Sequence, residues 1–369
     1  MDVIEAKKHI EWLKNKYRFT YSEKLKAYYL ADIMSLENFI HSMDPNYECG
    51  ISSQSVEYQK YRDRLLKEKE RRVEEVLEAN DENGILAKKY VSICDEVSFK
   101  EFIEADLSVK SEEEYMELFR DFMGSLGRDA YTKYNELIRN ESILCMPIEN
   151  YGGVCWDFPT LSKQVVVTDE DRGQYSYLAI AHEVGHAVHF HALNQVGRRT
   201  FEVNTFGESM SILFEKMYEN YLEKNGFKVL GLKNFTLSQR LGEAASIDMC
   251  SSATKKGYAV FNGYDVVFDE FKLDDIGMFP SRYKHLYEKL HPGLEYCQSL
   301  YYLIGDATSR IFLDEYGDNP SKCIKKMKEF LIASELRTHK ENIRSLELTD
   351  YDYPSLKLEL IKNGSYPKK

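Results

Sequence analysis

The sequence predicts a mainly α-helical protein with one small antiparallel β-sheet. Apolar residues recur at helical spacing along most of the 369 residues, as they do on the buried face of a helix. Glycines, prolines and a run of β-branched residues gather in one stretch, 146–173, which is typical of a hairpin. The length suits roughly two or three domain-sized units. We expect a helical lobe over 1–110 and the domain that carries the chemistry over 111–369, forming together one two-lobed unit around a cleft.

Helices are expected first, over residues 2–17, 22–43, 55–80, 84–106 and 111–139. Asp44-Pro45 ends the second of them, because proline disfavours continuation of a helix. The third is rich in charge, so we expect a solvated helix packed along one apolar face rather than a nucleic-acid site. The fifth opens with Ser111 before three glutamates, a pattern that favours an N-cap.

The sheet is predicted as a hairpin of GVCWDF (153–158) with KQVVVT (163–168). Thr168 and Asp169 then offer capping groups for the next helix. From there to the end the pattern is helical again. Glycines and prolines interrupt it at Gly226, Gly231, Gly263, Pro280 and Pro292-Gly293.

Composition argues against several classes of protein. Lysine and arginine number 49 against 61 aspartates and glutamates, a net charge of −12, which argues against non-specific nucleic-acid binding. No apolar run approaches the roughly 18 residues of a membrane span, and the first residues do not resemble a signal peptide. Seven cysteines, never spaced C-x-x-C, predict reduced thiols. We expect a cytoplasmic protein with no membrane or nucleic-acid partner, and the sequence leaves its oligomeric state open.

Four of the nine histidines fall between residues 182 and 191. His182 and His186 are four apart, so on a helix they lie one turn apart on the same face. Glu183 completes H-E-x-x-H, in which two imidazoles bind one Zn²⁺ while the glutamate activates a bound water. The surrounding residues are apolar, which predicts a buried helix where unpartnered imidazoles are costly. The alternative is a pair of hydrogen-bonded core histidines.

The other two histidines of this helix are not expected to bind the metal. His189 lies on roughly the same face as His182 but nearly two turns along the axis, too far to complete the site without a helix break. His191 points to the opposite face. We expect structural roles for both, and His189 as a residue that supports the metal ligands.

The third ligand must come from another element, and a helix predicted over 198–224 carries two candidates. Glu208 and Glu215 are seven apart and therefore lie on one face. We place Glu208 on the metal, which gives a His₂Glu set with an open fourth position. Glu215 lies two turns further, where it is suited to hold the other ring nitrogen of a histidine ligand. Glu202 is the main rival of Glu208.

Several segments resemble the thimet oligopeptidase and oligoendopeptidase F family of metallopeptidases. H-E-V-G-H-A-V-H (182–189) is similar to that family's form of the zinc motif, and G-E-S-M-S-I-L-F-E (207–215) to its third-ligand segment. N-Y-G-G-V-C (150–155) resembles the segment before its edge strand. H-P-G-L-E-Y-C-Q-S-L-Y-Y-L-I-G (291–305) resembles its cluster of histidine and tyrosine that contacts the substrate carbonyl. The resemblance covers roughly 115–369.

The resemblance implies a zincin-like helical metallopeptidase fold, with the small sheet beside the H-E-x-x-H helix and one Zn²⁺ per chain. Glu183 is then the general base. The oxyanion of the intermediate is held by the metal and by a donor from one of four residues, namely His291, Tyr296, Tyr301 and Tyr302.

Substrate binding is expected beside the hairpin. Gly152 and Gly153 belong to the segment that resembles the family. Val165 and Val166 lie on the strand Lys163–Thr168, which is a candidate for pairing with a substrate backbone by strand addition. The alternative is an ordinary edge strand.

We therefore expect a zinc-dependent metalloendopeptidase whose partner is an oligopeptide substrate. Three alternatives stay open: a carboxypeptidase of a related zincin family, a maturation enzyme dedicated to one peptide, and a catalytically silent peptide-binding protein. The intact Glu183 argues against the last. An exopeptidase needs a group that grips a peptide terminus, for which the candidates are Arg198, Arg199, Arg240 and Arg310.

Overall fold

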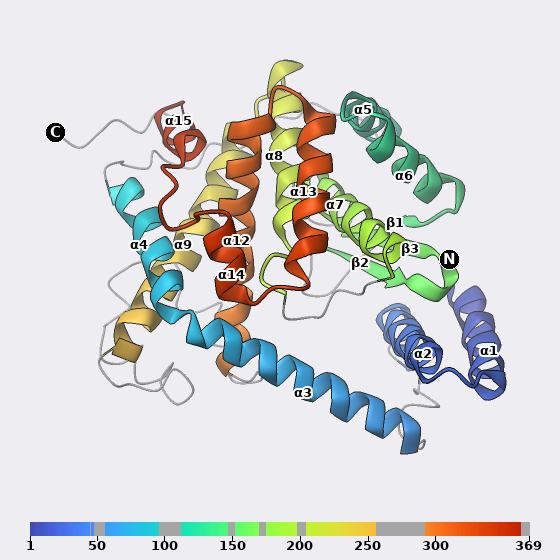
Figure 1. Cartoon of the computed structure of the whole chain (residues 1–369). Helices are drawn as coiled ribbons and strands as arrows, with labels where there is room; N and C mark the ends of the chain where they lie inside the picture. Colours follow the sequence, from blue (N-terminus) through green and yellow to red (C-terminus); the bar gives the residue numbers. More distant parts are fainter. Residues whose placement is uncertain are drawn as a thin grey trace. The chain divides into compact units, whose positions relative to one another are not determined.

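The computed structural model describes residues 1–44, 46–47, 56–95, 112–146, 152–169, 175–197, 204–255 and 292–362. Over these ranges the protein is mainly α-helical with one small sheet, as the sequence predicts (Figure 1). It divides into two compact units, and each is discontinuous in sequence. Unit 1 comprises Met1–Glu70 and Met116–Thr200, and unit 2 comprises Arg71–Tyr115 and Phe201–Lys369. The division into lobes over 1–110 and 111–369 stays a prediction.

The first predicted helices agree with the structure to within two residues at each end. They are α1 (Val3–Phe19), α2 (Glu23–Met43) and α3 (Val56–Glu78). Asp2 and Ser22 cap the first two, because their side chains accept hydrogen bonds from the backbone N–H groups of Glu5 and Leu25. The helix predicted over 84–106 is α4 (Asn80–Asp95), and the end of that prediction lies outside the described residues.

The single helix predicted over 111–139 is wrong, because the structure has two helices there. α5 (Glu112–Ser125) ends two residues before Gly127, and α6 (Arg128–Arg139) begins directly after it. Gly127 has a φ of +104°, a backbone conformation that residues with a Cβ rarely adopt. The apolar spacing continues across this break, so the glycine was the only local signal of it.

The sheet of unit 1 has three strands in the order β1-β3-β2. β2 (Gly153–Phe158) and β3 (Lys163–Thr168) form the predicted antiparallel hairpin, with Val154 opposite Val167. β1 (Ile143–Cys145) is an additional strand that pairs with β3 in parallel. β3 is therefore the central strand of this sheet.

The two faces of the sheet pack against different helices of unit 1. Phe158, Val165 and Val167 belong to the core formed with α1 and α2. Alternate residues face α7 (Tyr175–Gln195), where Asp157 accepts a hydrogen bond of 2.9 Å from the side-chain amide of Asn194. This alternation follows from the two-residue period of a strand. Burial of both faces explains the uninterrupted run of valines on β3.

The capping prediction before α7 is answered in part. Thr168 is the last residue of β3 and pairs with Gly153, and the next residue, Asp169, is not helical, so Thr168 is not an N-cap. Asp169 as the N-cap of this helix stays a prediction, because residues 170–174 lie outside the described residues.

Helices make up most of the described residues of unit 2. Besides α4 it contains α8 (Ser209–Lys224), α9 (Leu230–Lys255), α12 (Pro292–Tyr316), α13 (Pro320–Ser334), α14 (His339–Ser345) and α15 (Pro354–Lys362). α12 packs against α8, α9, α13 and α15, and α4 packs against α9. α12 is thus the central helix of this unit.

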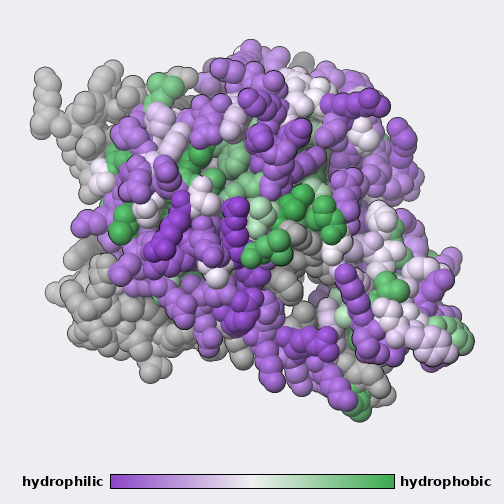
Figure 2. Space-filling view, in the orientation of Figure 1, coloured by the Kyte–Doolittle hydropathy of each residue, from purple (hydrophilic) through white to green (hydrophobic). Residues whose placement is uncertain are grey.

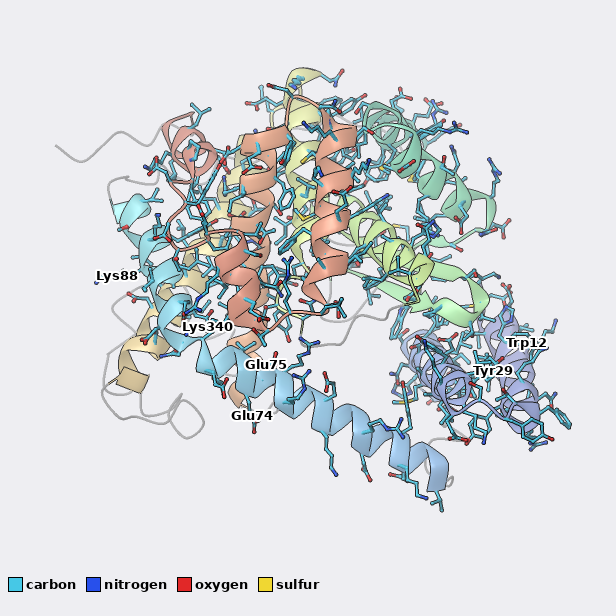
Figure 3. All side chains as sticks on the ribbon, viewed as in Figure 1. Trp12, Tyr29, Glu74, Glu75, Lys88 and Lys340 are labelled. Atoms are coloured by element: carbon cyan, nitrogen blue, oxygen red, sulfur yellow. The ribbon has the colours of Figure 1, made fainter. Side chains whose placement is uncertain are left out.

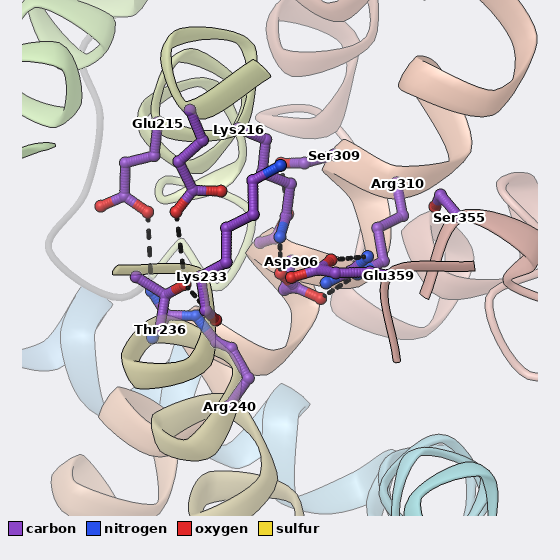
Figure 4. Close-up of polar contacts among 12 residues, drawn as sticks. Glu215, Lys216, Lys233, Thr236, Arg240, Asp306, Ser309, Arg310, Ser355 and Glu359 are labelled. Carbon is purple, nitrogen blue, oxygen red and sulfur yellow. Dashed lines mark hydrogen bonds and ion pairs between the residues drawn. The ribbon is translucent and has the colours of Figure 1, made fainter. Parts of the chain in front are cut away.

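A network of buried charges joins four helices of unit 2 (Figure 4). The carboxylate of Asp306 on α12 accepts hydrogen bonds from Tyr90 at 2.9 Å and from Arg310 Nε at 2.6 Å, and Lys216 Nζ lies 2.7 Å from it. Arg310 also pairs with Glu359 on α15 at 2.8 Å. Burial alone would raise the pKa of Asp306, but Arg310 and Lys216 hold it well below its usual range. Each charge here is compensated, as burial requires.

His339 at the start of α14 gives a testable pH dependence of stability. The ring is buried between the side chains of Thr205 at 2.7 Å and Asn83 at 2.9 Å, and burial lowers the pKa of His339 to about 3. Below the ordinary histidine pKa of about 6.5, the unfolded chain therefore binds a proton that the folded chain does not. Stability falls as the pH falls.

We expect the free energy of unfolding of the wild type to fall faster than that of His339→Gln. The difference should be about 1.4 kcal/mol per pH unit between about pH 6 and pH 4, measured by urea unfolding at a series of pH values. Burial raises the pKa of Glu219 and of Glu243 to about 7, which acts in the opposite direction. Both glutamates are common to the two proteins, so the comparison cancels them. Equal slopes would contradict the prediction.

Polar and charged side chains make up most of the face shown in Figure 2. α3 carries Glu74 and Glu75 (Figure 3), and Glu75 pairs with Arg71 and Arg72 on the same helix. The side chains of Arg72 and Glu75 are each only 16% exposed, so these pairs do not confirm the predicted solvated helix at this end of α3. Over the described ranges, no helix has both the length and the apolar character that a membrane span requires.

Candidate metal centre

α7 places the two motif histidines of unit 1 against each other. The helix packs on β2 and β3, and its apolar residues, including Ala181, Val184 and Ala187, are buried. The ring centroids of His182 and His186 lie 4.8 Å apart, and their Nε2 atoms 3.1 Å apart. Two nitrogen ligands of one tetrahedral zinc lie about 3.3 Å apart. The imidazole pair therefore fits a shared zinc ion, and the same separation fits the hydrogen-bonded pair that is the alternative.

Glu183 is buried against the start of β2. Its exposed fraction is 5%, and a Cβ added to Gly153 would lie 2.7 Å from Glu183 Cγ and 2.9 Å from Oε1. Glycine at this position is therefore what allows the carboxylate to lie beside the strand. Burial raises the pKa of the Cys155 thiol, and the charge of Glu183 raises it further. The sheet thus forms a close wall next to the predicted general base.

The remaining histidines of α7 have contacts of their own. His189 is 1% exposed, and its ring stacks on Phe190, with 5.8 Å between centroids. The same phenylalanine stacks on His186 at 5.7 Å. His191 accepts a hydrogen bond of 2.9 Å from the side-chain amide of Gln195. Phe190 therefore packs against both His186 and His189, while a supporting role of His189 toward the ligands stays a prediction.

Glu208 precedes α8 instead of lying inside it. The helix predicted from residue 198 begins at Ser209, and Glu208 is its N-cap residue. Asn204 forms a turn just before it: its side chain accepts a hydrogen bond from Phe206 N at 3.0 Å, and its carbonyl oxygen accepts one from Gly207 N at 2.8 Å. Asparagine favours such turns, which explains the late helix start. The rival Glu202 lies outside the described residues.

The side chain of Glu208 is held by neighbours within unit 2. Ser211 Oγ donates a hydrogen bond to its carboxylate at 3.1 Å. α12 approaches at Gly305, where an added Cβ would lie 2.9 Å from Glu208 Cβ and 2.7 Å from Ile212 Cδ1. Gly305 is not among the residues predicted for the site, although a glycine inside a helix often marks a packing requirement.

Glu215 lies within α8, seven residues after Glu208, and has an arginine partner. Arg240 on α9 lies 3.9 Å from Glu215, forms hydrogen bonds of 3.2 and 3.3 Å with Glu243, and lies over the Tyr302 ring at 4.7 Å from its centroid. The contact of Glu215 with a histidine ligand stays a prediction. Arg240 and Arg310 are both buried in ion pairs, so neither is exposed to grip a peptide terminus.

The sheet topology bears on strand addition along Lys163–Thr168 only in part. Val165 pairs with a residue of β2, and Val166 pairs with residues of both β1 and β2. Both side chains are 0% exposed. β1 pairs with Val166, Val167 and Thr168, so this half of β3 is paired on its two sides. Strand addition beside residues 163–165 stays a prediction. Among the described residues, β2 pairs with β3 alone, and Gly152 and Gly153 lie at its beginning.

The candidates for oxyanion stabilisation are described only in part. His291 and the side chain of Tyr296 lie outside what the structure describes. Tyr301 and Tyr302 follow each other on α12, and both are half-buried. Consecutive residues of a helix project about 100° apart, so the two hydroxyl groups cannot serve the same point equally well.

Comparisons with known proteins give likenesses in structure. No family model and no curated protein sequence matches the chain. One similar solved structure is a protein assigned as an oligoendopeptidase F from Bacillus anthracis (TM-score 0.43, 10% identity, 69% of this chain and 46% of that one). A second oligoendopeptidase F assignment has a TM-score of 0.49, 10% identity, and coverage of 69% and 48%. The structure of Pz peptidase A with an inhibitor has a TM-score of 0.46 and 12% identity, and the match covers 69% of this chain and 50% of that one. The chain thus spans about half the length of these structures.

Proposed function

We propose that the protein is a zinc-dependent peptidase that hydrolyses oligopeptides. The observation that carries the proposal is the motif on α7. His182 and His186 direct their Nε2 atoms at each other across 3.1 Å, and Glu183 is buried beside them against β2. Two imidazoles at this separation and an adjacent carboxylate are suited to a hydrolytic metal site.

One zinc ion per chain would be held by His182, His186 and Glu208, a set of two imidazoles and one carboxylate. Glu208 belongs to unit 2, and its place as the third ligand is part of the proposal. When bound, zinc supplies Lewis acidity, which polarises a peptide carbonyl and makes water more acidic. The hydroxyl of Ser211 favours one orientation of the Glu208 carboxylate, as hydrogen bonds to metal ligands commonly do.

Glu183 is the proposed general base. It takes a proton from the attacking water and later passes it to the leaving amine. Its burial beside Gly153 restricts the carboxylate to one region next to β2. A base restricted in this way needs little reorganisation to reach the reacting atoms.

The substrate is proposed to lie beside β2. This strand has β3 as its neighbour within the described sheet, and Gly152 and Gly153 leave little side chain at its start. An extended peptide that pairs with a strand gains affinity from backbone hydrogen bonds, with loose side-chain selectivity. The oxyanion would accept a hydrogen bond from one of His291, Tyr296, Tyr301 and Tyr302.

The test is cleavage of a mixture of oligopeptides by the purified full chain, with products identified by mass spectrometry and bound zinc quantified. We expect about one zinc per chain, internal cleavage, loss of cleavage after chelation and recovery after zinc is restored. Cleavage only at peptide ends would favour a carboxypeptidase. A chain that binds no zinc even when zinc is supplied would overturn the proposal.

Gly153→Ala should reduce hydrolysis without removing zinc. The added methyl group would overlap the Glu183 side chain, and displacement of a catalytic group by about 1 Å can lower kcat about 100-fold. Zinc content should not change, because the substitution does not touch the histidine pair. The matched control is Gly124→Ala on α5, where a Cβ meets nothing within 4 Å. Equal kcat values for the two variants would contradict the assigned role of Gly153.

A further inference from the structure

Arg240 connects three helices of unit 2 at the place where the candidate tyrosines lie. It is 5% exposed and projects from α9. Its guanidinium group donates to both carboxylate oxygens of Glu243 on the same helix and lies 3.9 Å from the carboxylate of Glu215 on α8 (Figure 4). Its central carbon lies 4.7 Å from the ring centroid of Tyr302 on α12.

The two carboxylates leave Arg240 no net charge to offer to an anionic ligand. They also hold the planar guanidinium group in one orientation, because its donors form a rigid fork. The remaining contact is with the ring of Tyr302. A guanidinium group within about 6 Å of an aromatic centroid attracts the ring, and more strongly where both are shielded from water. Arg240 thus restrains the position of that ring.

A restrained tyrosine is the kind of donor that oxyanion stabilisation requires. Donors that are already in place stabilise developing charge without reorganisation during the reaction. Tyr301 projects in another direction from the same helix.

We infer that Arg240 is a positioning residue that selects Tyr302 as the oxyanion donor. This inference rests on the proposed peptidase function. In this inference Arg240 affects catalysis only by positioning the Tyr302 ring, and Glu215 and Glu243 hold the arginine in place. The competing explanation is that Arg240 only stabilises the packing of α8, α9 and α12.

The test is a double-mutant cycle of Arg240→Met with Tyr302→Phe, in the full zinc-loaded chain. Tyr302→Phe should lower kcat by about 100-fold, the usual effect of losing one oxyanion donor, with KM nearly unchanged. Arg240→Met should lower kcat by about tenfold or more, also with KM nearly unchanged. In the Tyr302→Phe background, Arg240→Met should have no further effect on kcat. Tyr301→Phe should keep the wild-type kcat.

Lys233→Met is the matched control. Lys233 also lies on α9, is buried, and pairs with Glu223 on α8 at 2.7 Å. Its loss removes a buried cation between α8 and α9, so it reproduces the part of the structural effect that concerns these two helices and should leave kcat unchanged. Should Arg240→Met not fold, Arg240→Lys keeps the charge without the planar fork and enters the same cycle.

Two results would overturn the role of Arg240 alone: a kcat of Arg240→Met equal to that of Lys233→Met, or an equal loss with and without the Tyr302 hydroxyl. A wild-type chain that binds no zinc or cleaves no peptide would instead overturn the proposed function, and the role of Arg240 with it. Zinc content and wild-type cleavage are measured first, so the two failures are distinguishable.

Discussion

Glu183→Gln should abolish peptide hydrolysis while zinc stays bound. Glutamine has nearly the same volume, so it fits the space that Gly153 leaves beside β2. Its amide cannot accept the proton of the attacking water. A general base contributes up to about 10⁴-fold to a rate, so we expect kcat to fall by about 10³-fold or more. The measurement is product formation by mass spectrometry, with zinc quantified in both proteins.

Asp157→Asn is the control for the loss of a negative charge on this face of the sheet. Asp157 lies on β2 and contacts Asn194 of α7, but it has no assigned part in proton transfer. We expect this variant to keep most of the activity. A Glu183→Gln protein that still cleaves at a rate close to the wild type would contradict the mechanism, even with zinc present.

The local parts of the fold could be predicted because local patterns determine them. The hairpin follows from β-branched residues flanked by turn residues, and the histidine pair follows from four-residue spacing on an apolar helix. β1 could not be predicted in this way. It has three residues, and its parallel pairing with β3 depends on contacts between segments far apart in the chain. Three consecutive valines did carry a signal of a central strand, since they indicate burial on both faces.

The candidate site also has features that local patterns determine and features that depend on contacts between helices. The spacing of Glu208 and Glu215 is local, but Glu208 is the N-cap residue of α8 and lies before the helix instead of inside it. The late start of that helix depends on the turn at Asn204, whose hydrogen bonds replace helical ones. Gly305 and Arg240 act on residues of other helices. No spacing within one helix encodes such contacts, so they emerge only from the packed structure.

Glu208→Gln should remove most of the zinc affinity. Loss of a residue that merely supports a metal ligand lowers affinity 10- to 100-fold, so loss of a ligand should lower it by more than about 100-fold. The amide keeps the size of the side chain and its neighbour Ser211, so packing against α12 is preserved. Zinc affinity is measured by competition with a chromophoric chelator, which does not depend on activity.

Three further variants separate Glu208 from its neighbours. Glu202→Gln tests the rival ligand and should keep zinc affinity. Glu215→Gln removes the partner of Arg240 and should weaken zinc binding far less than Glu208→Gln. Gly305→Ala changes none of the proposed ligand residues. Its methyl group would overlap Glu208 Cβ, so it should weaken zinc binding by displacing the Glu208 carboxylate. Loss of zinc from Glu202→Gln, with Glu208→Gln unaffected, would reassign the third ligand and leave the close approach of Gly305 as a matter of packing alone.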